Sequence, residues 1–210
     1  MPIKLCVFDF DSTLMDGETI DILATNYGVG EEVSKITKLA MAGELDFFES
    51  LQRRVSLLKG MDEENVIKVA QNLTYMNGAK ELIKKLKEKN IKVVVFSGGF
   101  RVATSYAKEI LRFDADFANV LHVKNKKLTG LVGGDMMFGF SKGDMMQRLQ
   151  KLLGVKKIET MAVGDGANDV SMFNESYIKV AFCAKEALKK HANIIINEKD
   201  LTKIFNHIKL

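Results

Sequence analysis

Short, almost entirely apolar runs recur along the chain and predict the buried strands of a sheet. They are IKLCVF at 3–8, IKVVVF at 91–96, TMAV at 160–163 and IKVAF at 178–182. Segments of helical period lie between them; within 79–86, for example, apolar residues recur at i, i+3, i+4 and i+7. Strands that alternate with helices are typical of a mainly parallel sheet covered on both faces. We therefore predict the α/β class, with a Rossmann-like parallel sheet.

The segment from about 17 to 74 breaks this alternation. Apolar stripes of helical spacing occur in succession within 20–27, 33–40, 47–58 and 66–73, with no strand pattern among them. This predicts a small four-helix cap domain over 17–74, inserted after the first strand of a core made of 1–16 and 75–210. A second irregular stretch, 117–132, predicts a hairpin with a polar turn.

Composition and charge narrow the classes of function. The chain has 210 residues, of which 47% are hydrophobic and 28% charged, as in an ordinary globular protein. Its net charge of +4 favours anionic ligands, but the lysines and arginines form no basic block. No basic stripe interleaves with aromatic residues either, so a nucleic-acid partner is not expected.

Cysteine usage and hydropathy indicate the cellular compartment of the protein. Cys6 and Cys183 each lie in an apolar run, and we expect small buried hydrophobic residues in strands rather than a disulfide or a metal pair. No apolar run approaches the roughly 18 residues of a membrane span. Asp9 and Asp11 interrupt any signal-peptide core. We predict a cytoplasmic protein without a membrane partner.

Polar clusters follow the predicted strands at their carboxyl ends. Asp9 and Asp11 follow the first strand, the SGG at 97–99 follows the second, and GDGAND at 164–169 follows the third. Lys142 opens the helix that precedes the third strand. Ligands of open parallel sheets bind outside these strand ends. We therefore expect the clusters to converge on one rim of the sheet.

Each cluster alone has an ordinary explanation. The two aspartates fit turn or helix-cap positions, the SGG fits a strand-to-helix turn, and the lysine fits a solvated helix residue. GDGAND fits a glycine-rich turn with an Asn or Asp helix cap. It is not a dinucleotide fingerprint, which requires glycine where Asp169 stands, and it lacks P-loop spacing. Only their combination favours a shared site.

Converging carboxylates need a cation. Two unit charges 4 Å apart repel by roughly 4 kcal/mol at an effective dielectric of 20. Oxygen ligands without histidine or cysteine favour Mg²⁺ over zinc. Lysine, a hydroxyl and backbone N–H groups then suit a phosphoryl group. One carboxylate can act as nucleophile and form an aspartyl-phosphate. The second can protonate the leaving alkoxide and then deprotonate water.

At this point the motifs resemble a known family. DFDSTL, the SGG, the lysine of FSKGD and GDGAND are similar to the haloacid dehalogenase superfamily of aspartate-nucleophile phosphatases. MDGETID, GELDFFESLQRRVSLLKG, SGGF, AVGDGANDVSMF and KVAFCAK resemble the phosphoserine phosphatases of that superfamily. The motifs keep their order and spacing from about residue 4 to near the C-terminus.

The resemblance implies roles for the acidic residues. Asp9 is implied to be the nucleophile and a Mg²⁺ ligand. Asp11 is implied to be the general acid and base, with its backbone carbonyl on the metal. Asp165 is similar to the third protein ligand, and Asp169 to a residue that supports the site.

The phosphoryl group is implied to meet a second set of groups. The resemblance places Ser97, the Gly98 N–H and Lys142 on the phosphoryl oxygens. Asn168 is implied to form a hydrogen bond nearby.

The helical insertion is implied to recognise the rest of the substrate. The resemblance places Glu18 at its ammonium, Arg54 at its carboxylate and Phe47 on the pocket wall. On a helical wheel that starts at Phe47, Arg54 borders the apolar stripe, whereas Arg53 points the opposite way. An arginine suits a carboxylate because its planar fork binds both oxygens. Glu18 lies off its stripe, so its assignment rests on the resemblance alone.

The function implied is Mg²⁺-dependent hydrolysis of O-phospho-L-serine, the last step of L-serine biosynthesis. The expected partner is thus a small-molecule substrate; a homodimer is allowed, although no pattern selects an oligomeric state. Other small phosphomonoesters, phosphohomoserine or phosphoethanolamine, form a nearer alternative that only the cap can separate. A signalling receiver domain is a more distant one. The chain is too long for that compact fold, and Asp11 stands where hydrolysis needs an acid and base.

Three departures from the family pattern are visible. TYMNG at 74–78 lacks the expected proline, and MMFGF at 136–140, before Ser141 and Lys142, is unusually apolar. We expect the second to alter the flap or the loop that carries the lysine. We also expect no N-terminal regulatory domain.

Overall fold

A twisted sheet runs through the centre of the molecule. The computed structural model describes residues 2–41 and 44–208. Within these residues the strand order is β4-β3-β2-β1-β5-β6-β7, and only β4 pairs antiparallel to its neighbour. The strands are β1 (Leu5–Phe8), β2 (Lys92–Phe100), β3 (Ala115–Lys124), β4 (Lys127–Gly134), β5 (Thr160–Gly164), β6 (Ile178–Phe182) and β7 (Ile194–Ile196). The predicted α/β class with a mainly parallel sheet is confirmed.

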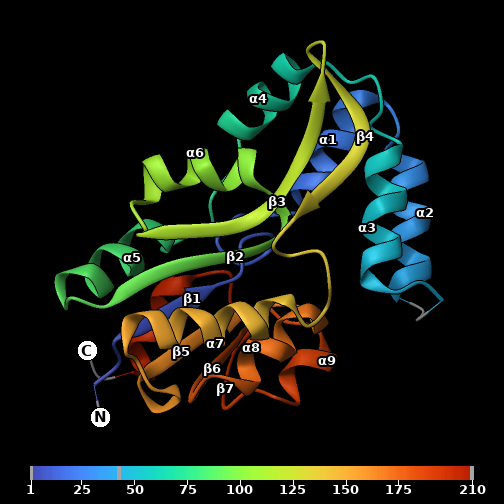
Figure 1. Ribbon diagram of the computed structural model, residues 1–210. Helices are drawn as coiled ribbons and strands as arrows, with labels where there is room; N and C mark the ends of the chain where they lie inside the picture. The colour runs from blue at the N-terminus through green and yellow to red at the C-terminus, as the bar shows by residue number, and fades with distance from the viewer. Residues whose placement is uncertain (1, 42–43, 209–210) are drawn as a thin grey trace.

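Helices cover both faces of this sheet (Figure 1). The first four are α1 (Thr19–Tyr27), α2 (Gly30–Met41), α3 (Phe47–Ser56) and α4 (Glu63–Gln71). They are followed by α5 (Ala79–Glu88), α6 (Arg101–Leu111), α7 (Ser141–Leu153), α8 (Val170–Asn174) and α9 (Glu186–Lys189). Short 3₁₀ helices are η1 (Lys157–Glu159), η2 (Ala167–Asp169) and η3 (Leu201–Asn206). Helices α5, α6 and η3 lie on one face, and α7, α8 and α9 lie on the other.

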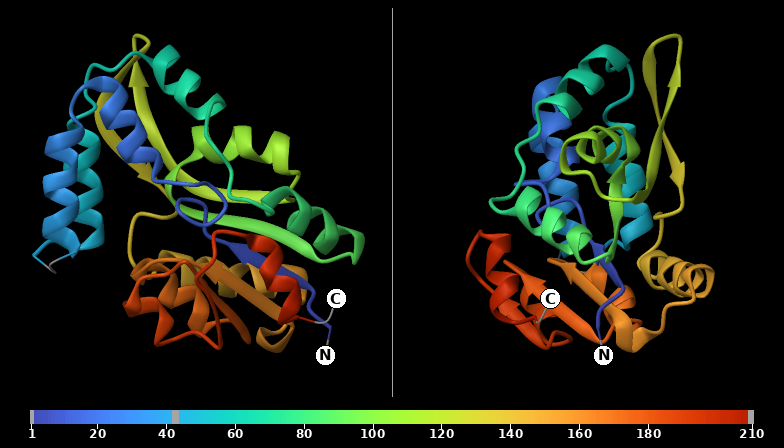
Figure 2. Two further views of the ribbon diagram at one scale, coloured as in Figure 1. Left: turned by 180° about the vertical axis from the view of Figure 1, so that it is seen from behind. Right: turned by 90° about the vertical axis from the view of Figure 1, so that its left-hand side faces the viewer.

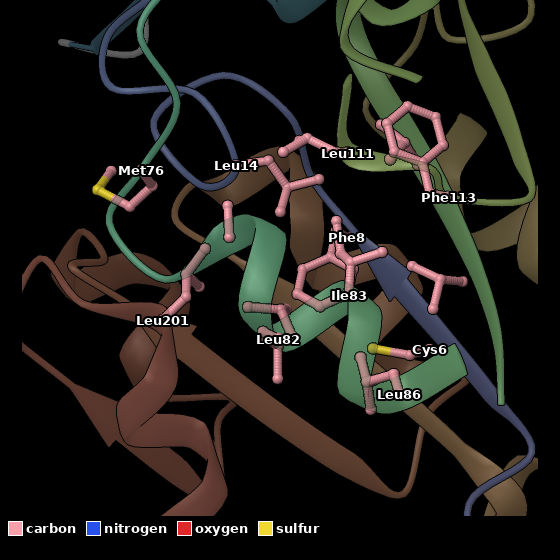
Figure 3. Packing of buried hydrophobic residues seen from close by; sticks show 14 of the residues in the cluster. Cys6, Phe8, Leu14, Met76, Leu82, Ile83, Leu86, Leu111, Phe113 and Leu201 are labelled. Carbon is pink, nitrogen blue, oxygen red and sulfur yellow. The ribbon is translucent and has the colours of Figure 1, made fainter. Parts of the chain in front are cut away.

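Strand β1 shows how the sequence builds this core. Its side chains alternate between faces, as in any strand. Cys6 and Phe8 belong to the cluster that α5 and α6 cover, whereas Leu5 and Val7 belong to the cluster that α7 and α8 cover. Figure 3 shows Cys6 and Phe8 beside Leu82, Ile83 and Leu86 of α5. A strand buried on both faces must be apolar throughout, which explains the run LCVF.

The chain between β1 and α5 forms a separate helical layer, α1 to α4, above one end of the sheet (Figures 1 and 2). This layer has its own apolar cluster, which includes Leu23, Leu51 and Val55. The β3–β4 hairpin extends from the sheet and adds Leu121 and Leu128 to it. The division into a core of 1–16 and 75–210 and a cap of 17–74 stays a prediction.

Two local expectations need correction. The predicted second strand stops at Phe96, but β2 continues through the SGG to Phe100. The continuation exists because β2 pairs with β3 beyond Ser97, with a shift of register between Ser97 and Phe100. Cys183 does not lie in a strand: it follows β6, is half-buried and has a φ of 45°.

The predicted hairpin is present, and its turn explains its sequence. Asn125 and Lys126 both have positive φ, 51° and 60°, as a two-residue turn between twisted strands requires. None of the helices within the described ranges has the length and apolar character needed to cross a membrane.

Candidate active site

The site is built at the carboxyl ends of β1 and β5, which are parallel neighbours. Asp9 follows β1 directly, and its N–H donates to the Val163 carbonyl over 2.8 Å. This bond extends the ladder and fixes the backbone from which both Asp9 and Asp11 project. Asp165 follows β5, so its carboxylate lies beside that of Asp9. All three aspartates are buried.

Lys142 connects the loop after β1 with the loop after β5. It is the second residue of α7, is 2% exposed, and its Nζ donates to Asp9 Oδ1 and to Asp169 Oδ1, each over 2.5 Å. The other oxygen of Asp169 accepts the N–H groups of Asp165 and Gly166 at 3.0 Å each. Asp169 therefore fixes the turn after β5 and the lysine at the same time.

Asp11 faces the helical insertion. Its Oδ1 accepts the N–H of Thr19 over 2.7 Å and the Thr19 hydroxyl over 2.5 Å. Its Oδ2 accepts the Ser97 hydroxyl over 3.3 Å. Thr19 is the first residue of α1, where backbone N–H groups have no partner within the helix. Asp11 thus supplies a partner for the start of the helix and links it to the sheet.

Burial and neighbouring charges shift the pKa values of Asp9, Asp11 and Lys142 from their usual values. Burial raises the pKa of Asp9, the Asp169 charge raises it further, and the Lys142 ammonium acts in the opposite direction. Burial also raises the pKa of Asp11, although the bonds from Thr19 and Ser97 offset part of the effect. Burial alone would lower the pKa of Lys142, but the Asp169 and Asp9 charges outweigh it, so the pKa lies above its usual value. The lysine stays cationic.

Three carboxylates form a donor set for a metal. Oxygens of Asp9, Asp165 and Asp169 all lie within 4.8 Å of one another, and all three side chains are buried. Burial, followed by the Asp169 charge, raises the pKa of Asp165 to about 6. Such a cluster of oxygen ligands with excess negative charge fits a divalent cation. The Asp11 side chain is not part of it.

Glycines allow close contacts at the end of β2. A Cβ on Gly98 would come within 2.8 Å of Phe47 Cζ and 3.8 Å of Asn168 Nδ2. A Cβ on Gly99 would collide with Asp11 Oδ2, and the Gly99 N–H donates to the Ser97 hydroxyl over 2.9 Å. Phe47 of α3 and Asn168 of the 164–169 loop therefore both flank Gly98.

Two charged residues of the insertion lie near these aspartates. Burial raises the pKa of Glu18 to about 7, with the Asp11 charge as the next cause, and Ser12 donates to Glu18 Oε1 over 2.8 Å. Burial lowers the pKa of Arg54, while the charges of Glu18, Asp21 and Asp11 act in the opposite direction. Opposite charges therefore share one half-buried environment beside Asp11.

Arg53 provides the contrast that the helical wheel predicts. It lies on the exposed side of α3 and pairs with Glu49 one turn earlier, at 2.5 Å. Arg54 is half-buried, and its Nε donates to the Ser50 carbonyl over 3.2 Å.

Comparison with known proteins identifies the family. A family model described as a haloacid dehalogenase-like hydrolase matches residues 3–176. A phosphoserine phosphatase of Wolinella succinogenes is 65% identical over 205 residues, which cover 98% of this chain and 100% of the relative. One of Campylobacter jejuni is 59% identical over 206 residues, with 98% and 100% covered. The chain belongs to the phosphoserine phosphatase family of haloacid dehalogenase-like hydrolases.

Solved structures of phosphoserine phosphatases have the same fold. A phospho-aspartyl intermediate analogue of one matches with a TM-score of 0.94 at 49% identity, covering 100% of both chains. A substrate-bound complex also matches with a TM-score of 0.94, at 48% identity and the same coverage. The resemblance inferred from the motifs is confirmed.

Sequence reasoning missed three residues around this phosphatase site. Thr19 binds Asp11, and its place at the start of a helix was the available signal. Lys185 lies 4.0 Å from Asp165 and carried no signal beyond its place in KVAFCAK. Asn119 of β3 is fully buried and bonds to both Gly98 and Met136; nothing in its local sequence indicates this.

Proposed function

We propose that this chain hydrolyses O-phospho-L-serine to L-serine and phosphate, the last step of L-serine biosynthesis, through an aspartyl-phosphate on Asp9. The assignment of the substrate rests on one observation: the opposite charges of Glu18 and Arg54 lie in one half-buried environment beside Asp11. A substrate with both an ammonium and a carboxylate on its leaving group complements that pair. The whole-length similarity to phosphoserine phosphatases supports the same conclusion.

In the first step, an Asp9 carboxylate oxygen attacks phosphorus as the bond from phosphorus to the serine oxygen breaks. The leaving alkoxide takes a proton from Asp11, which is protonated at this step. The phosphoryl oxygens bind the Lys142 ammonium, the Ser97 hydroxyl and the Gly98 N–H. Asn168 donates a hydrogen bond nearby.

In the second step, Asp11 removes a proton from water. The water oxygen attacks phosphorus, the bond to Asp9 breaks, and inorganic phosphate leaves with Asp9 restored as a carboxylate. Lys142 acts throughout as a fixed positive charge, because its two aspartate partners hold it in place.

We propose Mg²⁺ as the cation. Asp9, Asp165 and the Asp11 backbone carbonyl would hold it, and Asp169 would support the site by fixing the turn after β5. When bound, the cation offsets the negative charge that gathers where a carboxylate meets a phosphate.

Recognition of the amino acid is assigned to three residues. Glu18 pairs with the ammonium, Arg54 binds the carboxylate through its planar fork, and Phe47 forms the wall next to Gly98. The cap boundaries of 17–74, a cytoplasmic location and a homodimer stay predictions beside this assignment.

The first test measures phosphate release from L-phosphoserine, phosphohomoserine, phosphoethanolamine and an aryl phosphate, with Mg²⁺ and with EDTA. We expect Mg²⁺-dependent preference for L-phosphoserine, and only trace activity in Asp9→Asn. Arg54→Ala should raise the KM for phosphoserine by about tenfold or more, since a charged hydrogen bond contributes roughly 1.5–3 kcal/mol. Phosphoethanolamine has no carboxylate, and its KM should change little.

Arg53→Ala is the matched control, because it removes the same charge from the same helix on its exposed side. It should leave both KM values near those of the wild type. Equal effects of the two arginine variants, or equal effects of Arg54→Ala on both substrates, contradict the assignment of Arg54. Preference for another ester would keep the aspartate chemistry and overturn the substrate.

A further inference from the structure

Three phenylalanine rings stack where the helical insertion meets the loop before α7. The Phe48 ring, from α3, lies 5.0 Å from that of Phe138 between centroids, with an interplanar angle of 19°. Phe138 in turn stacks on Phe140 at 5.3 Å and 1°. We call these three residues the phenylalanine stack. Phe138 and Phe140 belong to the unusually apolar MMFGF segment.

On the side of the sheet, hydrogen bonds and a buried side chain fix the loop that carries Phe138 and Phe140. Met136 is buried in the cluster under α7 and α8, and its backbone N–H and carbonyl both bond to the Asn119 side chain, at 3.0 and 3.1 Å. The Phe138 N–H donates to the Ser141 hydroxyl over 3.1 Å. Ser171 donates to the Gly139 carbonyl over 3.0 Å. Phe138 therefore projects from a braced loop that leads directly into Lys142.

On the other side, the stack meets the helix that carries the proposed specificity residues. Phe48 is half-buried and follows Phe47, whose ring covers Gly98. Arg54 lies further along the same helix. A shift of α3 away from the loop would therefore move the wall residue and the proposed carboxylate ligand together.

Access to the site makes such a shift relevant. Asp9 is 4% exposed and Lys142 is 2% exposed, and Phe47 of α3 covers Gly98 nearby. A phosphoryl group that binds Lys142 therefore needs neighbouring residues to move, and we infer that α3 is among them. A stacked aromatic pair stabilises a contact only modestly. Even a modest stabilisation shifts the equilibrium between α3 held on the loop and α3 moved away from it.

We propose that Phe48 and Phe138 are positioning residues, whose stacked contact holds α3 on the lysine loop and so places Phe47 and Arg54 over the phosphoryl site. This inference rests on the proposed function, because it assigns the two rings to binding of the same substrate. Phe140 is not part of the proposed contact: it stacks on Phe138 from the MMFGF segment itself and is 60% exposed, compared with 45% for Phe138.

Steady-state kinetics on Phe48→Ala, Phe138→Ala and the double variant test this. Each single variant should raise the KM for phosphoserine by about two- to tenfold, the range expected for a lost aromatic pair, while kcat stays the same or rises. The double variant should have the same KM as the singles, because both remove one contact. Phe140→Ala is the matched control and should keep the wild-type KM.

Amide hydrogen exchange provides a readout that needs no turnover. Phe138→Ala should speed exchange along α3, although the substitution lies outside that helix, and Phe140→Ala should not. Unchanged KM in both single variants, additive effects in the double variant, or an equal effect of Phe140→Ala overturns the proposal. Faster exchange with unchanged KM overturns it as well, since α3 would then be held without positioning the substrate.

The two proposals fail separately. A wild-type enzyme inactive on phosphoserine would contradict the proposed function, and the exchange experiment would still decide whether the contact between Phe48 and Phe138 holds α3.

Discussion

Burial acts in the same direction on two neighbouring carboxyl groups that the proposed reaction uses differently. Asp11 and Glu18 both have raised pKa values, with burial as the largest cause. A protonated Asp11 is ready to protonate the leaving group. In the proposed binding mode a protonated Glu18 cannot pair with the ammonium, so the same physical effect should limit substrate binding at low pH. The proposed reaction therefore depends on keeping Glu18 ionised.

The pH dependence of kcat/KM checks this. Because the pKa of Glu18 is about 7, kcat/KM for phosphoserine should fall about tenfold per pH unit below that value. Glu18→Gln should lower kcat/KM at neutral pH and remove the decline near pH 7. The phosphate of the substrate ionises near pH 6, so it causes a separate decline of kcat/KM at lower pH. An aryl phosphate, which has no ammonium, should not show the decline near pH 7; a decline unaltered by Glu18→Gln would contradict the role.

The sequence indicated the residues that follow strands but not the partners that folding brings to them. Asp9, Asp11 and the 164–169 loop were found because strand ends of a parallel sheet meet at one edge. Thr19 and Asn119 were missed because their contacts join segments far apart in the chain or depend on how α1 begins. The helical wheel correctly predicted that Arg53 is exposed and Arg54 is half-buried, because the spacing of apolar residues indicates which side of a helix is buried. It carried no information on Glu18, which precedes α1.

At the level of elements, strand β3 connects the parts of the site. The Asn119 side chain donates to the Gly98 carbonyl over 3.0 Å and bonds to both backbone groups of Met136. Gly98 lies near the carboxyl end of β2, and Met136 lies in the loop that leads to Lys142. One buried amide therefore sets the spacing between the two proposed phosphoryl-binding segments.

Asn119→Ala should both destabilise the protein and reduce turnover. It leaves the N–H and the carbonyl of Met136 buried without their side-chain partner, each at a cost of roughly 1–3 kcal/mol, and it removes a bond to the part-buried Gly98 carbonyl. We expect the free energy of unfolding to fall by about 2–6 kcal/mol, and kcat/KM to fall at temperatures where the variant is still folded. Chemical denaturation and kinetics measure the two effects. Asn72→Ala removes an exposed amide that bonds to the Lys68 carbonyl, and should change neither by much.

The elements that sequence analysis described poorly have little local signal. The extension of β2 through Gly98 and Gly99 contradicts the strand preferences of glycine and exists because β3 supplies a partner. Strand β7 has three residues and pairs only with β6, so it was not predicted. The hairpin was predicted because its polar turn lies between apolar runs.

At the scale of the whole molecule, the fold gathers more negative charge than it neutralises. Asp9, Asp165 and Asp169 lie within one cluster; Lys142 forms hydrogen bonds with two of them, and Lys185 lies 4.0 Å from Asp165. The pKa values of Asp9 and Asp165 are raised, which means that ionising these groups opposes folding. A protein that maintains such a cluster has stability that depends on pH and on cations.

The sign of that dependence is fixed. A carboxyl group with a raised pKa in the folded state binds its proton more tightly there than in the unfolded chain, so its contribution to stability is lost as pH rises. For Asp165 the window runs from about pH 4, its value in the unfolded chain, to about 6 in the folded one. In EDTA, the free energy of unfolding should therefore fall across this window. Asp165→Asn should flatten the decline.

A bound divalent cation should reverse this behaviour, because it favours the ionised carboxylates. Mg²⁺ at a hundred times its dissociation constant should raise the free energy of unfolding by about 2.7 kcal/mol. Urea denaturation at pH 7.5 with increasing Mg²⁺ measures the gain, and Asp165→Asn should lose most of it. Asp144→Asn removes an aspartate from α7 outside the cluster and should keep the full gain. Equal stabilisation of both variants would place the cation elsewhere, and none in the wild type would remove Mg²⁺ from the proposed mechanism.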